Sequence, residues 1–263
     1  MSIPPGIKTI DLMVTLPRVE VEHQAGYLFK ETPRVAADDL LVEMDRFDVE
    51  LALIPVERDE SVARALLAGH PDRFIGCYSL DPHRTTPDEL RRAVEELGVV
   101  AAGAFPAGTT PQVAIDEAAW WPLYAACQDL AIPVFVNIGV PGPRWPASCQ
   151  HPMRLEAVCA DFPELAVVTR HGGEPWVAET IALMRTWSNL YYSTSAFAPR
   201  YYPAPILEFA NTDGGDRVLY AGYFPSGLSL ERIFDELATL PLAAEVWPGF
   251  LRTNAERVLR LLG

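Results

Sequence analysis

The sequence predicts an α/β fold of the (β/α)8 TIM-barrel class, with extra C-terminal helices, built as a single domain over residues 1–263. The first observation is an alternation of short β-rich runs with amphipathic helical stretches along the whole chain. The second is the number of these units, since eight strand–helix units fit a closed barrel better than an open doubly wound sheet. The third is the lack of a G-x-G-x-x-G or P-loop sequence, which argues against a nucleotide-binding doubly wound fold.

The predicted strands are short runs rich in β-branched and aromatic residues. In chain order they are residues 8–16, 49–56, 73–80, 99–106, 133–139, 166–173, 190–196 and 218–225. Helical periodicity lies between several of them, at residues 36–47, 86–98, 116–130, 151–162 and 175–187. Two of these helices carry a start signal, because Pro87 follows Thr86 and Pro175 opens the last of them. The tail at 242–262 predicts one or two helices that close one end of the barrel.

Composition narrows the partners and the location. With 21 basic and 35 acidic residues the formal charge is −14, the wrong sign for holding phosphate backbones, so no nucleic-acid partner is expected. No apolar run approaches the roughly 18 to 20 residues of a membrane span, and the start MSIPPGIKTI has no signal-peptide pattern, so a cytoplasmic protein is expected. The cysteines show no metal or disulfide spacing and are expected to be buried free thiols; they are Cys77, Cys127, Cys149 and Cys159.

The strand ends supply the candidate site residues, because the active site of a TIM barrel lies at the C-terminal ends of its strands. The polar or large side chains expected there are Met13, Thr15, Phe105, Asn137, His171, Ser193, Ser195 and Tyr223.

His171 is the strongest of these candidates. It ends a predicted strand in TRHGGEPW, and the two glycines after it permit a tight turn and the close approach of a ligand. No H-x-H pair, second strand-end histidine or strand-eight aspartate accompanies it, so a titratable group working without metal is predicted. The remaining histidines are expected to be solvated, in loops or beside helices, with His23 and His151 open as exceptions because their loops could cover the barrel mouth; the other two are His70 and His83.

Three further polar residues have two readings each. The phenol of Tyr223 can donate or accept a hydrogen bond at the end of the last strand, or it packs on Phe224. The amide of Asn137 can orient a carbonyl or carboxylate, or it satisfies backbone groups at a strand end. Asp11 shares the expected inward face of Met13, one layer lower, where a structural role and a substrate contact are equally open.

Four side chains near the expected mouth are predicted to contact substrate, in addition to Asp11 and Met13. Thr15 and Ser195 are strand-end hydroxyls, and Trp176 belongs to an aromatic group that forms core or lines a pocket wall. Glu174 lies close to His171 and either contacts the substrate or caps the following helix.

Several long segments carry a family resemblance that covers nearly the whole chain. They are Thr9-Ile10-Asp11, Glu43-Met44-Asp45-Arg46, HPDRFIGCYSLDP, WPLYAACQDLAIPVFVNIG, DFPELAVVTRHGGEPW, DRVLYAGYFP and Asn254-Ala255. With these segments in this order, the chain resembles the amidohydrolase-related family (amidohydrolase 2). That family includes aminocarboxymuconate semialdehyde decarboxylase, aromatic-acid decarboxylases and dicarboxylate lactonases. The resemblance implies a metal-dependent-hydrolase-like barrel.

The metal ligands that the resemblance implies are mostly replaced in this chain. Family members carry a histidine-x-histidine pair after the Ile-Asp of strand one, where this chain has Met13 and Thr15. Their strand-five histidine corresponds to Asn137, their strand-eight aspartate corresponds to Tyr223, and only the strand-six histidine is matched, by His171. Such a set is a poor shell for zinc or manganese, so a divergent member with no metal and no other cofactor is predicted.

The sequence therefore predicts a metal-independent enzyme that acts on a small cyclic or carboxylated metabolite. A hydrolase of the ring-opening, lactonase type is expected first and a lyase second, because lactonases with this resemblance work without metal. His171 is expected to be the general base, Tyr223 the general acid or oxyanion donor, and Asn137 the group that orients the substrate carbonyl. The alternative is a catalytically inactive barrel that binds a metabolite or a protein partner.

Two long segments are expected to cover the barrel mouth, namely residues 17–48 and 141–151. Their arginines Arg18, Arg34 and Arg144 are candidates for binding a substrate carboxylate. A homodimer is the default expectation for the assembly.

Overall fold

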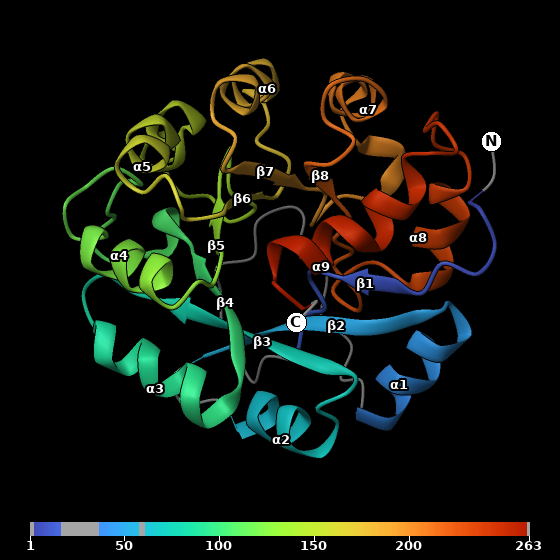
Figure 1. Ribbon diagram of the computed structural model, residues 1–263, viewed down its shortest axis with the longest axis horizontal. Helices are drawn as coiled ribbons and strands as arrows, with labels where there is room; N and C mark the ends of the chain where they lie inside the picture. The colour runs from blue at the N-terminus through green and yellow to red at the C-terminus, as the bar shows by residue number, and fades with distance from the viewer. Residues whose placement is uncertain (1–2, 17–36, 58–60, 262–263) are drawn as a thin grey trace.

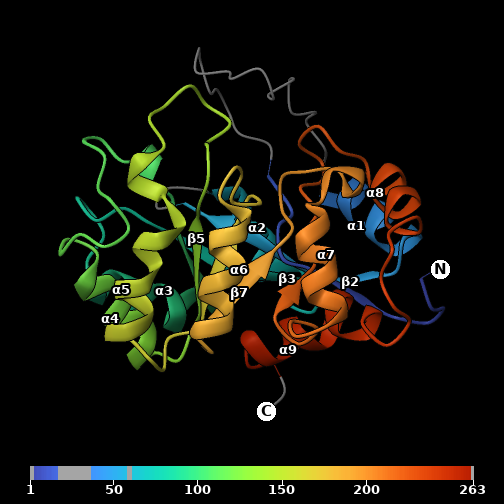
Figure 2. The same cartoon turned by 90° about the horizontal axis from the view of Figure 1, so that it is seen from above.

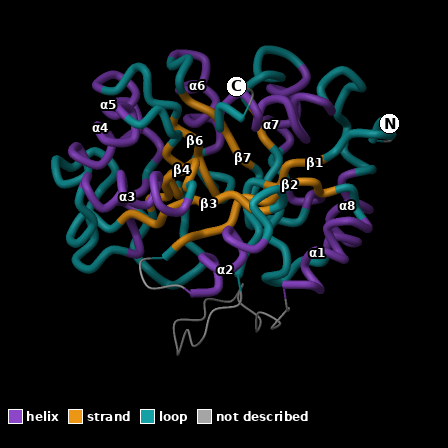
Figure 3. The backbone as a smooth tube through the Cα atoms, turned by 60° about the horizontal axis from the view of Figure 1, so that its bottom comes forward, coloured by secondary structure: helices purple, strands orange, loops and turns teal. Residues whose placement is uncertain are grey.

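The protein forms one curled parallel sheet surrounded by helices. The computed structural model describes residues 3–16, 37–57 and 61–261, so most of the predicted segment 17–48, with Arg18, His23 and Arg34, lies outside the described residues. Within the described ranges the sheet has eight parallel strands in the order β1 to β8. Figure 1 shows helices α1 to α8 arranged around the strands, and Figure 3 shows the strands gathered inside the ring of helices. The predicted TIM barrel is confirmed.

The elements alternate as the sequence predicts. The strands are β1 (Thr9–Asp11), β2 (Val49–Val56), β3 (Phe74–Leu80), β4 (Val99–Ala104), β5 (Val134–Asn137), β6 (Val167–Arg170), β7 (Leu190–Ser193) and β8 (Val218–Leu219). The α-helices are α1 (Ala37–Arg46), α2 (Ser61–Gly69), α3 (Pro87–Leu97), α4 (Trp121–Asp129), α5 (Leu155–Asp161), α6 (Val177–Thr186), α7 (Ala204–Asn211), α8 (Leu230–Leu237) and α9 (Asn254–Val258). Short helical turns are η1 (Pro106–Gly108), η2 (Ser148–Gln150), η3 (Pro152–Arg154), η4 (Pro199–Tyr201) and η5 (Gly249–Thr253), the last of them π-helical.

The first and last strands are shorter than predicted. The sequence predicts strands at 8–16 and 218–225, whereas β1 ends at Asp11 and β8 ends at Leu219. The reason is that the described part of the sheet has no ladder between β1 and β8. The backbone N–H of Tyr220 donates instead to the carbonyl of Phe250 at 2.8 Å, so the C-terminal tail takes the place of a partner strand.

The seam between β1 and β8 is closed by contacts outside the ladder. Toward the C-terminal end of the strands, the N–H of Thr15 donates to the carbonyl of Phe224 at 2.7 Å. In the middle, Oδ1 of Asp11 accepts the N–H of Gly222 at 2.8 Å and that of Met13 at 2.9 Å. A side chain at Gly222 would collide with this carboxylate, because its Cβ would lie 2.4 Å from Oδ2 of Asp11. Asp11 therefore replaces part of the missing ladder.

The barrel interior is packed separately from the layer between barrel and helices. The inner cluster includes Ile10, Leu53, Phe135 and Val168, and Val258 of α9 packs against it. Figure 2 places α9 at one end of the barrel and the segment after β5 at the opposite end. The predicted closing helix is thus present, and it covers the end of the barrel where the strands begin.

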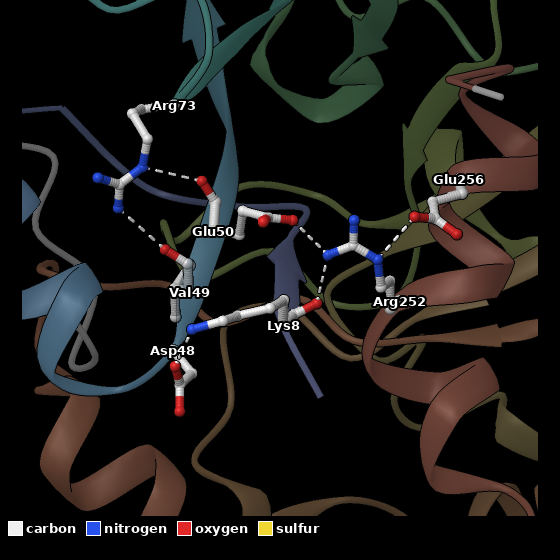
Figure 4. Close-up of polar contacts among 7 residues, drawn as sticks. All are labelled: Lys8, Asp48, Val49, Glu50, Arg73, Arg252 and Glu256. Carbon is white, nitrogen blue, oxygen red and sulfur yellow. Dashed lines mark hydrogen bonds and ion pairs between the residues drawn. The ribbon is translucent and has the colours of Figure 1, made fainter. Parts of the chain in front are cut away.

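Ion pairs hold this N-terminal end together, as Figure 4 shows. Nη1 of Arg252, in η5, donates to Oε2 of Glu50 at 2.5 Å and to the carbonyl of Lys8 at 2.7 Å. Its Nε donates to Oε1 of Glu256 in α9 at 2.6 Å, and Lys8 pairs with Asp48. One arginine thereby joins the chain before β1 to strand β2 and to the closing helix.

In the described parts of the chain, every helix is too short or too polar to cross a membrane.

Candidate active site

Strained backbone gathers at the C-terminal ends of the last three strands. Among the described non-glycine residues, φ is positive at His171 (65°), Ala196 (76°) and Tyr223 (152°), which follow β6, β7 and β8. The other described residues of this kind lie two positions after the ends of helices α1, α4 and α9, where a left-handed residue ends a helix in the ordinary way; they are Asp48, Ala131 and Arg260. Strained residues cost about 1–3 kcal/mol each and persist mainly where a site requires them.

His171 is held by a single hydroxyl group. Oγ of Ser195, a fully buried residue, accepts the backbone N–H of His171 at 3.1 Å and lies 3.0 Å from its ring atom Nδ1. Both predicted site residues are therefore brought together by the ends of β6 and β7. Ser195 holds His171 at its backbone N–H and at one ring nitrogen, because a hydroxyl can accept one hydrogen bond and donate another.

The ring of His171 stays neutral at physiological pH. Burial lowers the pKa of His171 from 6.5 to about 3, and the neighbouring Arg170 guanidinium lowers it further, while the backbone of Ser195 raises it in part. A neutral imidazole has one N–H donor and one bare nitrogen, and which nitrogen carries the proton decides what the ring can do.

Tyr223 completes the contact. Its ring meets that of His171 edge-on, with centroids 5.5 Å apart and planes at 86°. Tyr223 is half-buried and packs against the outer core cluster, so both readings of the residue given by the sequence are compatible with its position.

Asn137 lies on the neighbouring strand, β5, and is buried. Its Cα is paired in register with that of Arg170 on β6, one residue before His171. No hydrogen bond of its side chain is found within the described residues, so the amide remains available to a ligand.

Arg170 is a site residue that the sequence argument missed. It is 8% exposed, its Nη2 lies 3.2 Å from Sγ of Cys77, and its guanidinium lies over the ring of Phe135 at 4.8 Å. Phe135 and Cys77 belong to the inner cluster, so this side chain crosses the interior of the barrel. The signal was present in the sequence, because Arg170 is two residues from the inward-facing Val168 and therefore shares its face.

The side chains of Asp11 and Thr15 make hydrogen bonds within the protein. Asp11 lies on the outer side of the wall and not on the inward face expected from its spacing to Met13, because Ile10 and Leu12 face the inner cluster and Asp11 accepts a bond from the buried hydroxyl of Tyr220 at 3.3 Å. Oγ1 of Thr15 donates to Oγ of Ser226 at 2.9 Å and to the carbonyl of Phe224 at 3.2 Å, at the end of the seam where the strands end.

The other predicted contact residues lie around the mouth without meeting one another. Met13 is half-buried against the inner cluster, and Glu174 is exposed. Trp176 packs on His151 of the predicted lid, with ring centroids 4.4 Å apart. The lid segment 141–151 is anchored at this end, where Nε2 of the buried Gln150 donates to the carbonyl of Gly139 at 2.7 Å.

The donor set does not fit the metal that the resemblance implies. Within the described ranges no three His, Cys, Asp or Glu side chains are close enough to share an ion. Oγ1 of Thr15 donates within the seam, and the carboxylate of Asp11 already accepts two backbone N–H groups and the hydroxyl of Tyr220. Met13 and Asn137 add a thioether and an amide, which are weak ligands for zinc or manganese.

A cavity of about 260 Å³ lies at the opposite end of the barrel. It is lined by Gly6, Ile7, Lys8, Glu50, Pro248, Arg252 and Thr253, and its charged groups are those already paired in Figure 4. Groups at this face of a TIM barrel serve stability, so the strand-end residues remain the candidate site.

The chain is similar to a family of known enzymes. A family model described as "Amidohydrolase" matches residues 17–261. The search of curated proteins found no match.

Solved structures share the fold. An uncharacterised TIM-barrel protein from Bordetella bronchiseptica is 24% identical with a TM-score of 0.78, over 96% of this chain and 98% of that chain. A 2,6-dihydroxybenzoate decarboxylase from Rhizobium is 17% identical with a TM-score of 0.73, over 97% and 99%. A 5-carboxyvanillate decarboxylase from Novosphingobium aromaticivorans, solved with bound manganese, is 17% identical with a TM-score of 0.70, over 97% of each chain. These identities establish a shared fold and leave the activity to be argued from the site.

Proposed function

Since the chain belongs to the amidohydrolase family, we propose that it is a lyase or hydrolase acting on a small cyclic, carboxylated metabolite without a protein-bound metal. The names of two similar structures, decarboxylases of 2,6-dihydroxybenzoate and 5-carboxyvanillate, support this substrate class. One observation carries the proposal, namely the contact of His171 with Ser195 and Tyr223 at three strained strand ends.

We infer that His171 acts as a neutral hydrogen-bond donor. The backbone N–H of His171 donates to Oγ of Ser195, and we assign the proton of this hydroxyl to a hydrogen bond with Nδ1, which lies 3.0 Å away. Nδ1 is then bare, and the ring proton is on Nε2. This assignment departs from the general-base role predicted from the sequence, and the low pKa of His171 supports it, because a ring that binds a proton so weakly is a poor base.

A neutral donor suits reactions in which a substrate oxygen gains negative charge. In decarboxylation of a hydroxybenzoate, a proton from the solvent first bonds to the ring carbon that carries the carboxylate, and the phenolate becomes a dienone. The C–C bond to the carboxylate then breaks, its electron pair moves through the ring to the dienone oxygen, and CO2 leaves as the phenolate is restored. In ring-opening hydrolysis, the oxygen of water bonds to the acyl carbon, the ring C–O bond breaks and a proton passes to the leaving oxygen. Nε2–H of His171 and the phenol of Tyr223 stabilise the oxygen charge in both. Decarboxylation needs no group to activate water, so this donor set favours the lyase.

The test is turnover of a defined panel by four variants. The panel contains 2,6-dihydroxybenzoate, 5-carboxyvanillate and carboxylated six-membered lactones, followed by CO2 release and by absorbance. His171→Ala should lower kcat at least about a hundredfold and Tyr223→Phe about tenfold. His171→Gln retains an amide donor and should stay within about tenfold of the wild type. The control is His83→Gln, whose ring contacts the carbonyl of Pro111 on the surface, and it should leave turnover unchanged.

Unchanged turnover in His171→Ala contradicts the assigned site. A protein that binds members of the panel and converts none favours the alternative, a barrel that has kept its pocket and lost its chemistry.

A further inference from the structure

Arg170 carries a positive charge inside the barrel without a counter-ion in the described part of the chain. It is 8% exposed, and no ion pair joins it to any described carboxylate. Its Nε is fully buried and has no hydrogen-bond partner. An arginine stays charged at every accessible pH, and leaving a buried charge unpaired costs several kcal/mol.

The surroundings of this guanidinium are shaped to hold it. The ring of Phe135 lies under it at 4.8 Å, and Nη2 lies 3.2 Å from Sγ of Cys77. Gly103 makes room for it, because a Cβ there would lie 3.0 Å from Nη1 and 3.3 Å from that sulfur. The stacking on Phe135 and the absence of a side chain at Gly103 thus fix the position of the Arg170 guanidinium in the barrel interior.

None of these neighbours neutralises the charge. Burial raises the pKa of the Cys77 thiol, although Arg170 opposes this, so the sulfur stays protonated. Glu57, which follows β2, accepts a hydrogen bond from the hydroxyl of Ser79 at 3.1 Å, and its negative charge helps to raise the pKa of the Cys77 thiol. The positive charge therefore remains available to a ligand.

We propose that Arg170 forms an anion subsite inside the barrel, next to the C-terminal ends of the strands, which takes a carboxylate of the small-molecule ligand. The proposal rests on the proposed function for the identity of that ligand as a substrate. One cationic group beside a phenyl ring, a neutral thiol and a glycine matches a single carboxylate, whereas a phosphate dianion requires more donors. The carboxylate of the ligand lies deep in the barrel, and the remainder of the molecule extends toward His171 and Asn137. His171 is the next residue after Arg170, and Asn137 is paired in register with Arg170 on the neighbouring strand β5.

The experiment uses benzoate as the probe and benzamide as its neutral counterpart. Thermal unfolding of the full chain is measured with each compound, because a ligand that binds only the folded state raises Tm. Benzoate should raise the Tm of the wild type, and benzamide should not. Arg170→Met, which keeps the length and removes the charge, should weaken benzoate binding at least about a hundredfold.

The stability of the free variants separates a ligand site from a structural role. Without ligand, Arg170→Met should keep or raise Tm, because an unpaired buried charge is removed. The matched control is Arg217→Met, since Arg217 donates to the carbonyl of Met184 and Trp187; it should lower Tm and leave benzoate binding unchanged. Gly103→Ala is a second variant that keeps the arginine and displaces its Nη1, and it should also weaken benzoate binding.

Three results would overturn the subsite: a wild type that benzoate does not stabilise, equal binding of benzoate by Arg170→Met, or a Tm loss in Arg170→Met without a loss of binding. The proposed function fails separately. If the protein binds benzoate through Arg170 but converts no compound of the panel, the anion subsite is supported and the proposed enzymatic function fails. If Arg170→Met converts carboxylates with an unchanged KM, the proposed enzymatic function is supported and the anion subsite fails.

Discussion

Asp11 makes the stability of the barrel seam depend on pH. It is fully buried, and burial raises its pKa from 3.8 to about 6 even though bonds from Gly222, Met13 and Tyr220 lower it. The folded state therefore binds more protons than the unfolded chain between these two values. The stability contributed by this group is complete below pH 3.8 and is lost as the pH rises through 6. The loss at neutral pH is about 3 kcal/mol.

Asp11→Asn removes this dependence while keeping the shape of the side chain. Its amide oxygen can still accept the N–H groups of Gly222 and Met13. The free energy of unfolding of the variant relative to the wild type should therefore rise by about 3 kcal/mol between pH 3.5 and pH 7.5. Urea unfolding followed by tryptophan fluorescence at several pH values measures this difference, and the slope of each curve checks that two-state behaviour is kept.

Taking the difference between two proteins removes the contributions of other groups. His171 acts in the opposite direction, because its lowered pKa makes stability fall as the pH drops from 6.5 toward about 3. Asp88→Asn, on the surface of α3 and next to Arg91, is the control and should shift by no more than about 0.5 kcal/mol. A difference between Asp11→Asn and the wild type that stays constant from pH 3.5 to 7.5 contradicts a raised pKa of Asp11 in the folded protein.

Three further predictions concern the seam, the histidine and the metal. Gly222→Ala should lower the free energy of unfolding by about 2–4 kcal/mol, because the added Cβ would lie 2.4 Å from Oδ2 of Asp11. The control is Gly69→Ala, whose Cβ would have no atom within 4 Å and which should leave the free energy of unfolding unchanged. Urea unfolding measures both variants, and equal values would contradict the close contact at the seam. Ser195→Ala should lower kcat about tenfold or more with a smaller change in KM, since His171 loses a hydrogen bond at its ring and another at its backbone N–H; normal steady-state kinetics would argue against a positioning role. Elemental analysis after purification without chelators should find less than about 0.1 metal per chain, and near-stoichiometric zinc or manganese would overturn the reading of the donor set.

The fold was predictable because its signal is repeated along the chain. Each strand is a short β-rich run between turn residues, and the run at 49–56 matches β2 residue for residue. The seam was not predictable, since the partner of Tyr220 is Phe250 in a π-helical turn that has no period of its own in the sequence. The first and last strands were predicted too long for the same reason.

The site was predictable in part. The residue type and the glycines after it single out His171, but its contact with Ser195 depends on how two strand ends meet in space. Arg170 was missed although its position shares the inward face of Val168, because a charged residue inside a barrel runs against the pattern used to find strands. Asp11 was placed on the wrong face because β1 ends there and the alternation was extended through it.

The protonation state of His171 decides between a neutral donor and a general base, and it can be measured without a substrate. Long-range proton–nitrogen NMR of histidine-labelled protein, with His171→Gln to assign the signal, reports which ring nitrogen carries the proton between pH 4 and pH 8. A neutral ring with its proton on Nε2 and no titration above pH 5 is the predicted result, given the bond from Ser195 and a pKa of about 3. A ring that titrates near its ordinary value of 6.5, or one that carries the proton on Nδ1, would contradict the donor role and restore the general base.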